Sequence, residues 1–240
     1  MKVLAIIQAR TGSTRLPNKV LIKIQEKPIL HLIIEFLKFC KLIDKIVVAT
    51  TDLHEDDKIE YLCRELKIDC FRGSPTDVLK RYYDCAKMYN GELIIRITAD
   101  DPLLDPEIVD QVIRTCIKTK CDFASTSIGN KFPIGYFIEA VTFSTLEKLY
   151  RTQNDPLTRE HVTYYIKQNL NSFNVQQINP PSGLSRPTWR LTLDYSEDLL
   201  LFSKIFDLLY KQNSFINYSD RKSTRLNSSH SQQSRMPSSA

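Results

Sequence analysis

The amino-acid sequence contains no apolar run of the roughly 18 residues that a membrane-spanning helix needs. Its longest apolar stretch, near residues 29–37, is interrupted by His31 and Glu35. A secretory signal is not recognisable either, because Lys2 is followed by a short strand-like run and then by a polar loop. We therefore expect a soluble protein of the cytoplasm that binds no membrane.

Cysteine spacings typical of metal or redox motifs are also absent. The six cysteines occur singly, with no Cys-x-x-Cys pair and no histidine at ligand spacing. This pattern predicts free thiols in a reducing cytosol. The cysteines are Cys40, Cys63, Cys70, Cys85, Cys116 and Cys121.

The excess of positive charge is small, and most of it lies in the C-terminal segment. The chain has 33 Lys and Arg against 28 Asp and Glu, which gives a net charge of +5. Residues 220–240 hold four of the basic residues and one acidic residue, so the rest of the chain has 29 and 27 and a net charge of +2. Net charge therefore does not favour a nucleic-acid partner.

Residues 220–240, DRKSTRLNSSHSQQSRMPSSA, differ in composition from the rest of the chain. They lack apolar periodicity and are rich in Ser, Arg and Asn, which predicts disorder. The segment resembles the in-frame translation of a sequencing-adapter oligonucleotide, with the sample index at 231–233. That resemblance implies a non-native tail and a missing native C-terminus, while a Ser/Arg-rich tail that binds RNA is the alternative. We expect one domain over residues 1–219.

The remaining chain alternates strand and helix patterns. Short apolar runs between polar loops predict strands, and apolar residues three and four positions apart predict helices. This alternation predicts βαβ units, a mostly parallel mixed sheet and a three-layer α/β/α Rossmann-like fold. The expected strands are 2–7, 45–51, 68–71, 92–97, 122–126, 136–143, 173–177 and 189–193; the expected helices are 28–40, 56–66, 76–88, 106–119, 144–150, 159–168 and 196–210, with Thr76 and Ser196 as N-caps.

Polar clusters follow several expected strands, at the edge where ligands of such sheets bind. The first, residues 8–19 (QARTGSTRLPNK), combines small residues with cations. Small residues let backbone N–H groups converge on an anion, and cations supply countercharge. The cluster is neither a Walker loop nor a dinucleotide fingerprint. It indicates either a polyphosphate site or an ordinary basic loop, and its notable residues are Arg10, Gly12, Ser13, Arg15 and Lys19.

Carboxylates follow two other expected strands. Asp100 and Asp101 lie in the TADDP segment (98–102) directly after 92–97, and Asp194 directly follows 189–193. Mg²⁺ usually binds one or two carboxylates together with phosphate oxygens, so Asp100 and Asp194 are candidate metal ligands. The alternatives are an Asp-Pro turn at the first position and a residue that merely precedes a helix cap at the second.

Two further clusters open helices. One contains Arg72 and Asp77, and the other contains Arg159, Glu160 and His161. A lone histidine at a helix start is more often structural than catalytic. Together, Arg159 and His161 would suit an acidic substrate.

Six segments in this order resemble the CMP-sugar synthetase family of cytidylyltransferases, most closely its spore coat polysaccharide biosynthesis protein F branch. They span almost all of residues 1–219, which makes the resemblance far more specific than any single motif. The segments are AIIQARTGSTRLPNKVL (5–21), VVATTD (47–52), RGSPTDVLKRYY (72–83), RITADDPLLDP (96–106), REHVT (159–163) and WRLTLDYSEDL (189–199).

This resemblance implies the nucleotide-diphospho-sugar transferase fold and transfer of CMP from CTP to a sugar, with Mg²⁺ as cofactor and pyrophosphate as product. The implied acceptor is a 3-deoxy-2-keto sugar acid or a related sugar for surface or spore-coat polysaccharide, and many relatives are homodimers. Carried over by position, Gln8, Ala9, Arg10, Gly12, Ser13, Arg15 and Lys19 bind the nucleotide; Arg10, Lys19 and Asp100 are catalytic; Asp100 and Asp194 bind the metal; and Arg72, Asp77, Arg159, Glu160 and His161 face the sugar.

Two departures from the Kdo- and sialate-activating branches leave the sugar and a strict preference for cytosine open. Gln8 replaces a proline, and TADDP at 98–102 replaces Q-G-D-E-P. Three other functions are therefore retained as alternatives. They are a sugar-1-phosphate nucleotidyltransferase or glycosyltransferase on the same fold, a nucleotide-binding module without activity, and a nucleic-acid-binding protein that depends on the tail.

Overall fold

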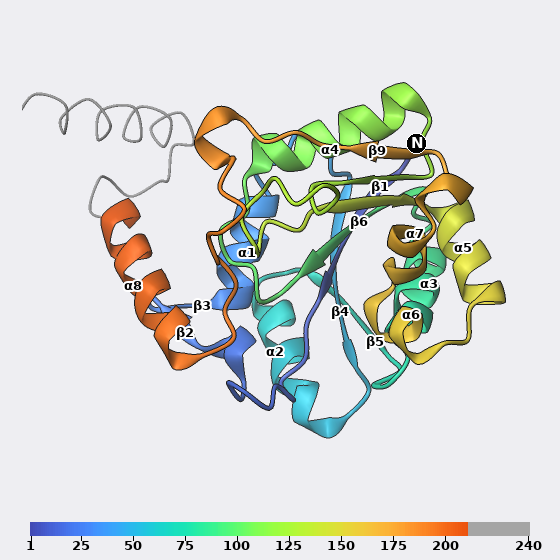
Figure 1. The fold of residues 1–240 in the computed structure, drawn as a ribbon. Coiled ribbons are helices and arrows are strands. Elements are labelled where there is room, and N and C mark those ends of the chain that lie inside the picture. The colour runs from blue at the N-terminus through green and yellow to red at the C-terminus, as the bar shows by residue number, and fades with distance from the viewer. Residues whose placement is uncertain (211–240) are drawn as a thin grey trace, which may run out of the picture.

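A sheet of seven strands forms the middle of the fold (Figure 1). The computed structural model describes residues 1–210, so the predicted tail at 220–240 lies outside the described residues. The strand order is β5-β4-β1-β6-β8-β7-β9, and only β8 runs antiparallel to its neighbours. The predicted mostly parallel mixed sheet is therefore confirmed. The strands are β1 (Val3–Gln8), β4 (Lys45–Thr51), β5 (Asp69–Gly73), β6 (Leu93–Thr98), β7 (Phe123–Ser125), β8 (Glu139–Thr142) and β9 (Val175–Gln177), and a separate hairpin pairs β2 (Lys23–Ile24) with β3 (Lys27–Pro28).

Helices cover both faces of the sheet, which confirms the three-layer architecture (Figure 1). One hydrophobic core joins α1, α2, α4 and α8 to the sheet, and a second core joins α3, α5 and α7 to the opposite face, where α6 packs on α3. Within residues 1–210, no helix is both long and apolar enough to cross a bilayer. The helices are α1 (Ile29–Leu37), α2 (Asp57–Glu65), α3 (Val78–Met88), α4 (Pro106–Thr119), α5 (Phe143–Thr152), α6 (Pro156–His161), α7 (Tyr164–Gln168) and α8 (Ser196–Tyr210).

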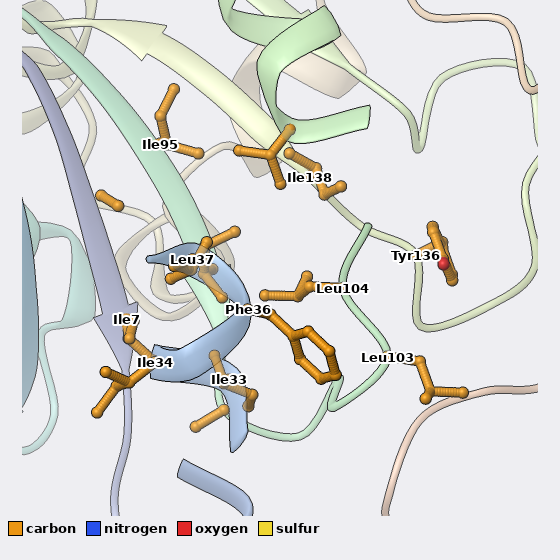
Figure 2. Packing of buried hydrophobic residues seen from close by; sticks show 14 of the residues in the cluster. Ile7, Ile33, Ile34, Phe36, Leu37, Ile95, Leu103, Leu104, Tyr136 and Ile138 are labelled. Carbon is orange, nitrogen blue, oxygen red and sulfur yellow. The ribbon is translucent and has the colours of Figure 1, made fainter. Parts of the chain in front are cut away.

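Packing against α1 holds the segment that follows β6. Phe36 of α1 faces Leu103 and Leu104, and all three side chains are at least nine-tenths buried (Figure 2). Asp105 ends this segment by accepting hydrogen bonds from the backbone N–H groups of Glu107 and Ile108, at the start of α4. Burial of one such side chain contributes roughly 1.5–3 kcal/mol, so the connection after β6 is held firmly at both ends.

One helix cap differs from the prediction. The carboxylate of Asp77, and not the hydroxyl of Thr76, accepts a hydrogen bond from the backbone N–H of Lys80 at the start of α3. At α8, which begins at Ser196, the side chain of Asp198 accepts from two backbone N–H groups of the preceding loop. At α3 a long-range ion pair with Arg159 also holds the Asp77 carboxylate, whereas the bonds that Asp198 accepts at α8 are local.

The helix expected over 159–168 is broken at Val162. This residue has φ 50° and ψ −61°, and the N–H of Thr163 donates to the carbonyl of His161 at 2.5 Å, which forms a γ-turn between α6 and α7. Such a conformation costs about 1–3 kcal/mol for a β-branched residue. Complete burial of Val162 and a hydrogen bond from the side chain of Thr163 to Glu139 hold the turn in place.

The strand expected over 189–193 does not form, apart from one bridge between Arg190 and Ile134. The backbone of this segment bonds first to Ile134, at 2.7–2.8 Å, and then to the carbonyl of Asp100, which accepts from Leu193 N–H at 2.8 Å. Because its partners lie on two different loops, the segment cannot extend a single ladder. It instead links the loop near Ile134 to the end of β6.

Gly135 allows the backbone of 189–193 to pass close to the loop near Ile134. Its φ is 95°, and a Cβ atom there would lie 2.3 Å from the carbonyl oxygen of Leu191. We predict that Gly135→Ala lowers the free energy of unfolding by about 2–4 kcal/mol, because it adds left-handed strain to a backbone overlap. Urea denaturation measures the change.

The matched control is Gly183→Ala, where nothing lies within 4 Å of the added atom. Its free energy of unfolding should stay within about 1 kcal/mol of the wild-type value. Equal stability of the two variants would contradict this account of the 189–193 segment.

Candidate active site

The predicted basic loop and the two predicted carboxylates meet at one point. Lys19 Nζ lies 2.8 Å from Asp100 Oδ2 and 3.0 Å from Asp194 Oδ1, and it also donates to the carbonyl of Leu193 at 3.0 Å. The Lys19 side chain is only 12% exposed. Asp100 and Asp194 are 81 and 175 positions away from Lys19 in the sequence. The fold therefore brings three distant parts of the chain together at the carboxyl edge of the sheet.

Asp56 anchors the loop that follows β1. Its carboxylate accepts hydrogen bonds from the backbone N–H and the hydroxyl of Thr11, both at 2.7 Å, and from the hydroxyl of Thr51. Burial alone raises the pKa of Asp56, but these hydrogen bonds hold it below its usual value. The backbone N–H of Ser13 donates to the carbonyl of Thr11, so a phosphate could accept from this N–H only by replacing that bond. Gly12 is exposed at the tip of the loop.

The residues at the beginning of the loop lie in different environments. Gln8 Oε1 is 3.4 Å from Arg96 Nη2, Ala9 is buried with its N–H on the carbonyl of Ala49, and Arg10 is exposed. Of these three predicted nucleotide-binding residues, Arg10 is therefore the one that is exposed to solvent.

The adjacent carboxylates of Asp100 and Asp101 lie in different environments. Asp100 is 31% exposed and contacts Lys19, whereas Asp101 is 3% exposed and accepts from the hydroxyl of Thr98 at 2.9 Å. Burial raises the pKa of Asp101 well above its usual value. Only the first carboxylate of the pair faces the site, as the prediction of Asp100 as the ligand requires.

Asp194 contacts three cations. Arg15 Nη2 and Lys19 Nζ approach Oδ1 at 2.8 and 3.0 Å, and Arg190 Nη2 approaches Oδ2 at 2.8 Å. Arg190 also pairs with Asp198, which is four residues along from Asp194. The sequence did not single out Arg190 or Asp198, although their spacing around Asp194 in WRLTLDYSED is a signal that points to them.

The residues expected to face a sugar do not form one group. Asp77 and Arg159 pair at 3.1 Å, while Glu160 and His161 are exposed at the end of α6. Arg72 is elsewhere: its guanidinium pairs with acidic residues of α2 and with backbone carbonyls. The contacts of Arg72 are those of a structural residue that joins β5 to α2.

The sequence analysis did not predict a buried ionic network centred on Glu139. Glu139 is fully buried on the sheet face that carries α3 and α7, and it lies 3.1 Å from Arg96 Nη1, 2.9 Å from Lys167 Nζ and 2.8 Å from the hydroxyl of Thr163. Burial by itself raises the pKa of Glu139, but Arg96 and Lys167 outweigh burial and hold it below its usual value. Through Arg96 the network reaches Gln8, at the edge of the site. In the sequence, the signal for this network is one charged residue inside each of two apolar strands, Arg96 in β6 and Glu139 in β8.

Asp100 and Asp194 fit a magnesium ion that arrives with phosphate. Within the described residues, no group of three or more His, Cys, Asp or Glu side chains is arranged to hold a metal by itself. The two carboxylates nevertheless converge on one positive charge, the ammonium of Lys19. Mg²⁺ commonly binds one or two carboxylates and takes its other ligands from phosphate and water, which matches this donor set.

We predict that Glu139→Gln lowers the free energy of unfolding by about 3 kcal/mol at pH 7, because it leaves two cations without their buried countercharge. The folded pKa of Glu139 is depressed, so its stabilisation is fully present above the unfolded value of about 4.3 and is lost as the pH falls below it. The free energy of unfolding, measured by urea denaturation, should therefore fall less between pH 7 and acidic pH in the variant than in the wild type.

Glu147→Gln is the matched control, because Glu147 forms a partly exposed pair with Arg151. We expect a change below about 1 kcal/mol in its free energy of unfolding at pH 7. If Glu139→Gln lowered the free energy of unfolding no more than the control does, the network would not stabilise the fold.

Comparisons with known proteins agree with this architecture. The family model described as "Cytidylyltransferase" matches residues 4–228. An uncharacterised protein of Methanocaldococcus jannaschii is 43% identical, over 87% of this chain and 86% of its own length. Spore coat polysaccharide biosynthesis protein SpsF of Bacillus subtilis is 35% identical, over 82% of each chain. The structure of a cytidylyltransferase from Leptospira borgpetersenii superposes with a TM-score of 0.86 at 33% identity and covers 100% of both chains. The chain therefore belongs to the cytidylyltransferase family.

Proposed function

We propose that the protein transfers CMP from CTP to a sugar and releases pyrophosphate. The observation that carries the proposal is the convergence of Lys19, Asp100 and Asp194 beside an exposed basic loop. Membership of the cytidylyltransferase family supports CTP as the nucleotide. The reaction is in-line attack of a sugar hydroxyl on the α-phosphorus, and it depends on positioning and electrostatics more than on a nucleophilic side chain.

The loop after β1 binds the triphosphate in this proposal. Arg10 is exposed at the loop, Arg15 is about half exposed, and Lys19 lies at the base. In this proposal the three cations neutralise the charge of the phosphates. The backbone N–H of Gly12 at the tip completes the anion-binding surface. Asp56 holds the loop in this conformation by its contacts with Thr11.

Asp100 and Asp194 are the residues that would hold Mg²⁺. When bound, this ion would neutralise charge on the pyrophosphate leaving group and orient the α-phosphate. The role of Lys19 is to neutralise the same region from the loop side, within reach of both carboxylates.

The acceptor in the proposal is a 3-deoxy-2-keto sugar acid or a related sugar of a surface polysaccharide. The naming of the Bacillus subtilis relative for spore coat polysaccharide biosynthesis supports this class. Arg159 and His161 lie on α6, and Arg159 is oriented by its ion pair with Asp77. These two side chains are the candidates for recognising an acidic group on the sugar.

We predict that the protein with Mg²⁺ releases pyrophosphate from CTP and not from UTP, ATP or dTTP when a panel of 3-deoxy sugar acids and sugar phosphates is supplied. CTP alone should raise the melting temperature, because a ligand that binds only the folded state stabilises it. A thermal shift without pyrophosphate release from any acceptor would support a binding module instead. No shift with any nucleotide would contradict the proposal.

Lys19→Met and Asp100→Asn should each lower kcat at least about 100-fold, because each removes charge that acts on the phosphates in the transition state. Lys23→Met is the matched control: Lys23 is exposed in β2, four residues beyond Lys19. The control should keep wild-type kcat and KM. A normal rate in either site variant, with folding verified by circular dichroism, would remove that residue from the site.

A further inference from the structure

The two oxygens of the Asp194 carboxylate contact different kinds of cation. Oδ1 accepts from Arg15 Nη2 at 2.8 Å and from Lys19 Nζ at 3.0 Å, and both of these residues belong to the loop after β1. Oδ2 accepts from Arg190 Nη2 at 2.8 Å, and Arg190 lies in the same short segment as Asp194. Only 11% of the Asp194 side chain is exposed, so its orientation is set by these contacts.

Arg190 is held locally and does not depend on the loop. Its Nη1 donates to Asp198 Oδ1 at 2.5 Å, while Asp198 Oδ2 accepts from the backbone N–H groups of Asp194 and Tyr195 at 2.8 and 2.9 Å. The guanidinium thus joins two carboxylates that are also joined through the backbone. A planar fork with several fixed donors suits this task, whereas an ammonium group does not reproduce it.

Lys19 and Arg15 belong to the loop that the proposed function assigns to the triphosphate, so phosphate oxygens would compete with Asp194 for both cations. The carboxylates of Asp100 and Asp194 contact Lys19, Arg15 and Arg190. A divalent cation added to this cluster would be repelled by cations already in contact with the carboxylates. Phosphates that attracted Lys19 and Arg15 would leave Oδ1 of Asp194 and the carboxylate of Asp100 free to hold a metal.

We propose that Arg190 is a positioning residue that holds Asp194 through Oδ2 and keeps Oδ1 for a metal ion, which enters with the nucleotide in exchange for Lys19. This inference rests on the proposed function. It assigns the affinity for the metal to two residues that do not bind it: Arg190 orients the ligand, and Lys19 competes with the metal when the nucleotide is absent.

The test uses Mn²⁺ as the probe, with protein-bound ion measured by electron paramagnetic resonance in the presence and absence of CTP. The wild-type protein should bind Mn²⁺ at least tenfold more tightly with CTP than without it. Arg190→Gln should weaken binding in the presence of CTP at least tenfold, while its thermal shift with CTP in EDTA stays as in wild type. A purely structural role of Arg190 would change both measurements.

Arg186→Gln is the matched control, because Arg186 lies in the same segment but contacts Trp189 and the carbonyl of Ser185. It should bind Mn²⁺ and CTP as the wild type does. Should Arg190→Gln fail to fold, Arg190→Lys replaces it: an ammonium lacks the planar fork whose two nitrogens contact Asp194 and Asp198 separately, so at least a threefold loss is expected. Lys19→Met should raise the affinity for Mn²⁺ without CTP at least tenfold.

Unchanged Mn²⁺ affinity with CTP in the Arg190 variants would overturn the positioning role, and no gain in Lys19→Met would overturn the exchange. Both results would leave the proposed function intact. Failure of the wild-type protein to bind CTP or Mn²⁺ with CTP would instead overturn the proposed function together with this inference.

Discussion

Attraction between Lys19 and the carboxylates of Asp100 and Asp194 is the interaction on which the site depends. Two carboxylates this close repel each other unless a cation lies between them, and Lys19 supplies that cation from the loop after β1. The ion pairs also join three distant parts of the chain: that loop, the end of β6 and the segment before α8. A site built in this way is prepared to exchange one cation for another.

The surrounding structure supports this cluster from both sides of the sheet. On one face, Phe36 packs against the segment that carries Asp100, and Asp56 anchors the loop. On the other face, Glu139 neutralises Arg96, which reaches Gln8. Buried charges are costly unless they are paired, so the pairing of β6 with β8, which places Arg96 opposite Glu139, is a strict requirement of the fold.

Much of the architecture was predictable, because periodicity reports which face of an element is buried. The strand–helix alternation up to α4 is confirmed, and it placed Asp100 at the edge where Lys19 lies. The predictions for 159–168 and 189–193 were wrong in detail. In both places long-range hydrogen bonds override the local pattern: Thr163 turns toward Glu139, and the backbone near Leu193 bonds to Asp100.

The sequence by itself determined the fold class and the edge of the sheet at which the polar clusters gather, because the carboxyl ends of parallel strands share one edge. Only the tertiary structure decided that Asp101 turns inward while Asp100 contacts Lys19, that Arg72 of β5 pairs with acidic residues of α2, and that Arg190 contacts one oxygen of Asp194 while Lys19 contacts the other. Those outcomes depend on the register between strands and on the path of a loop past Gly135. Neither is encoded in the spacing of residues along the chain.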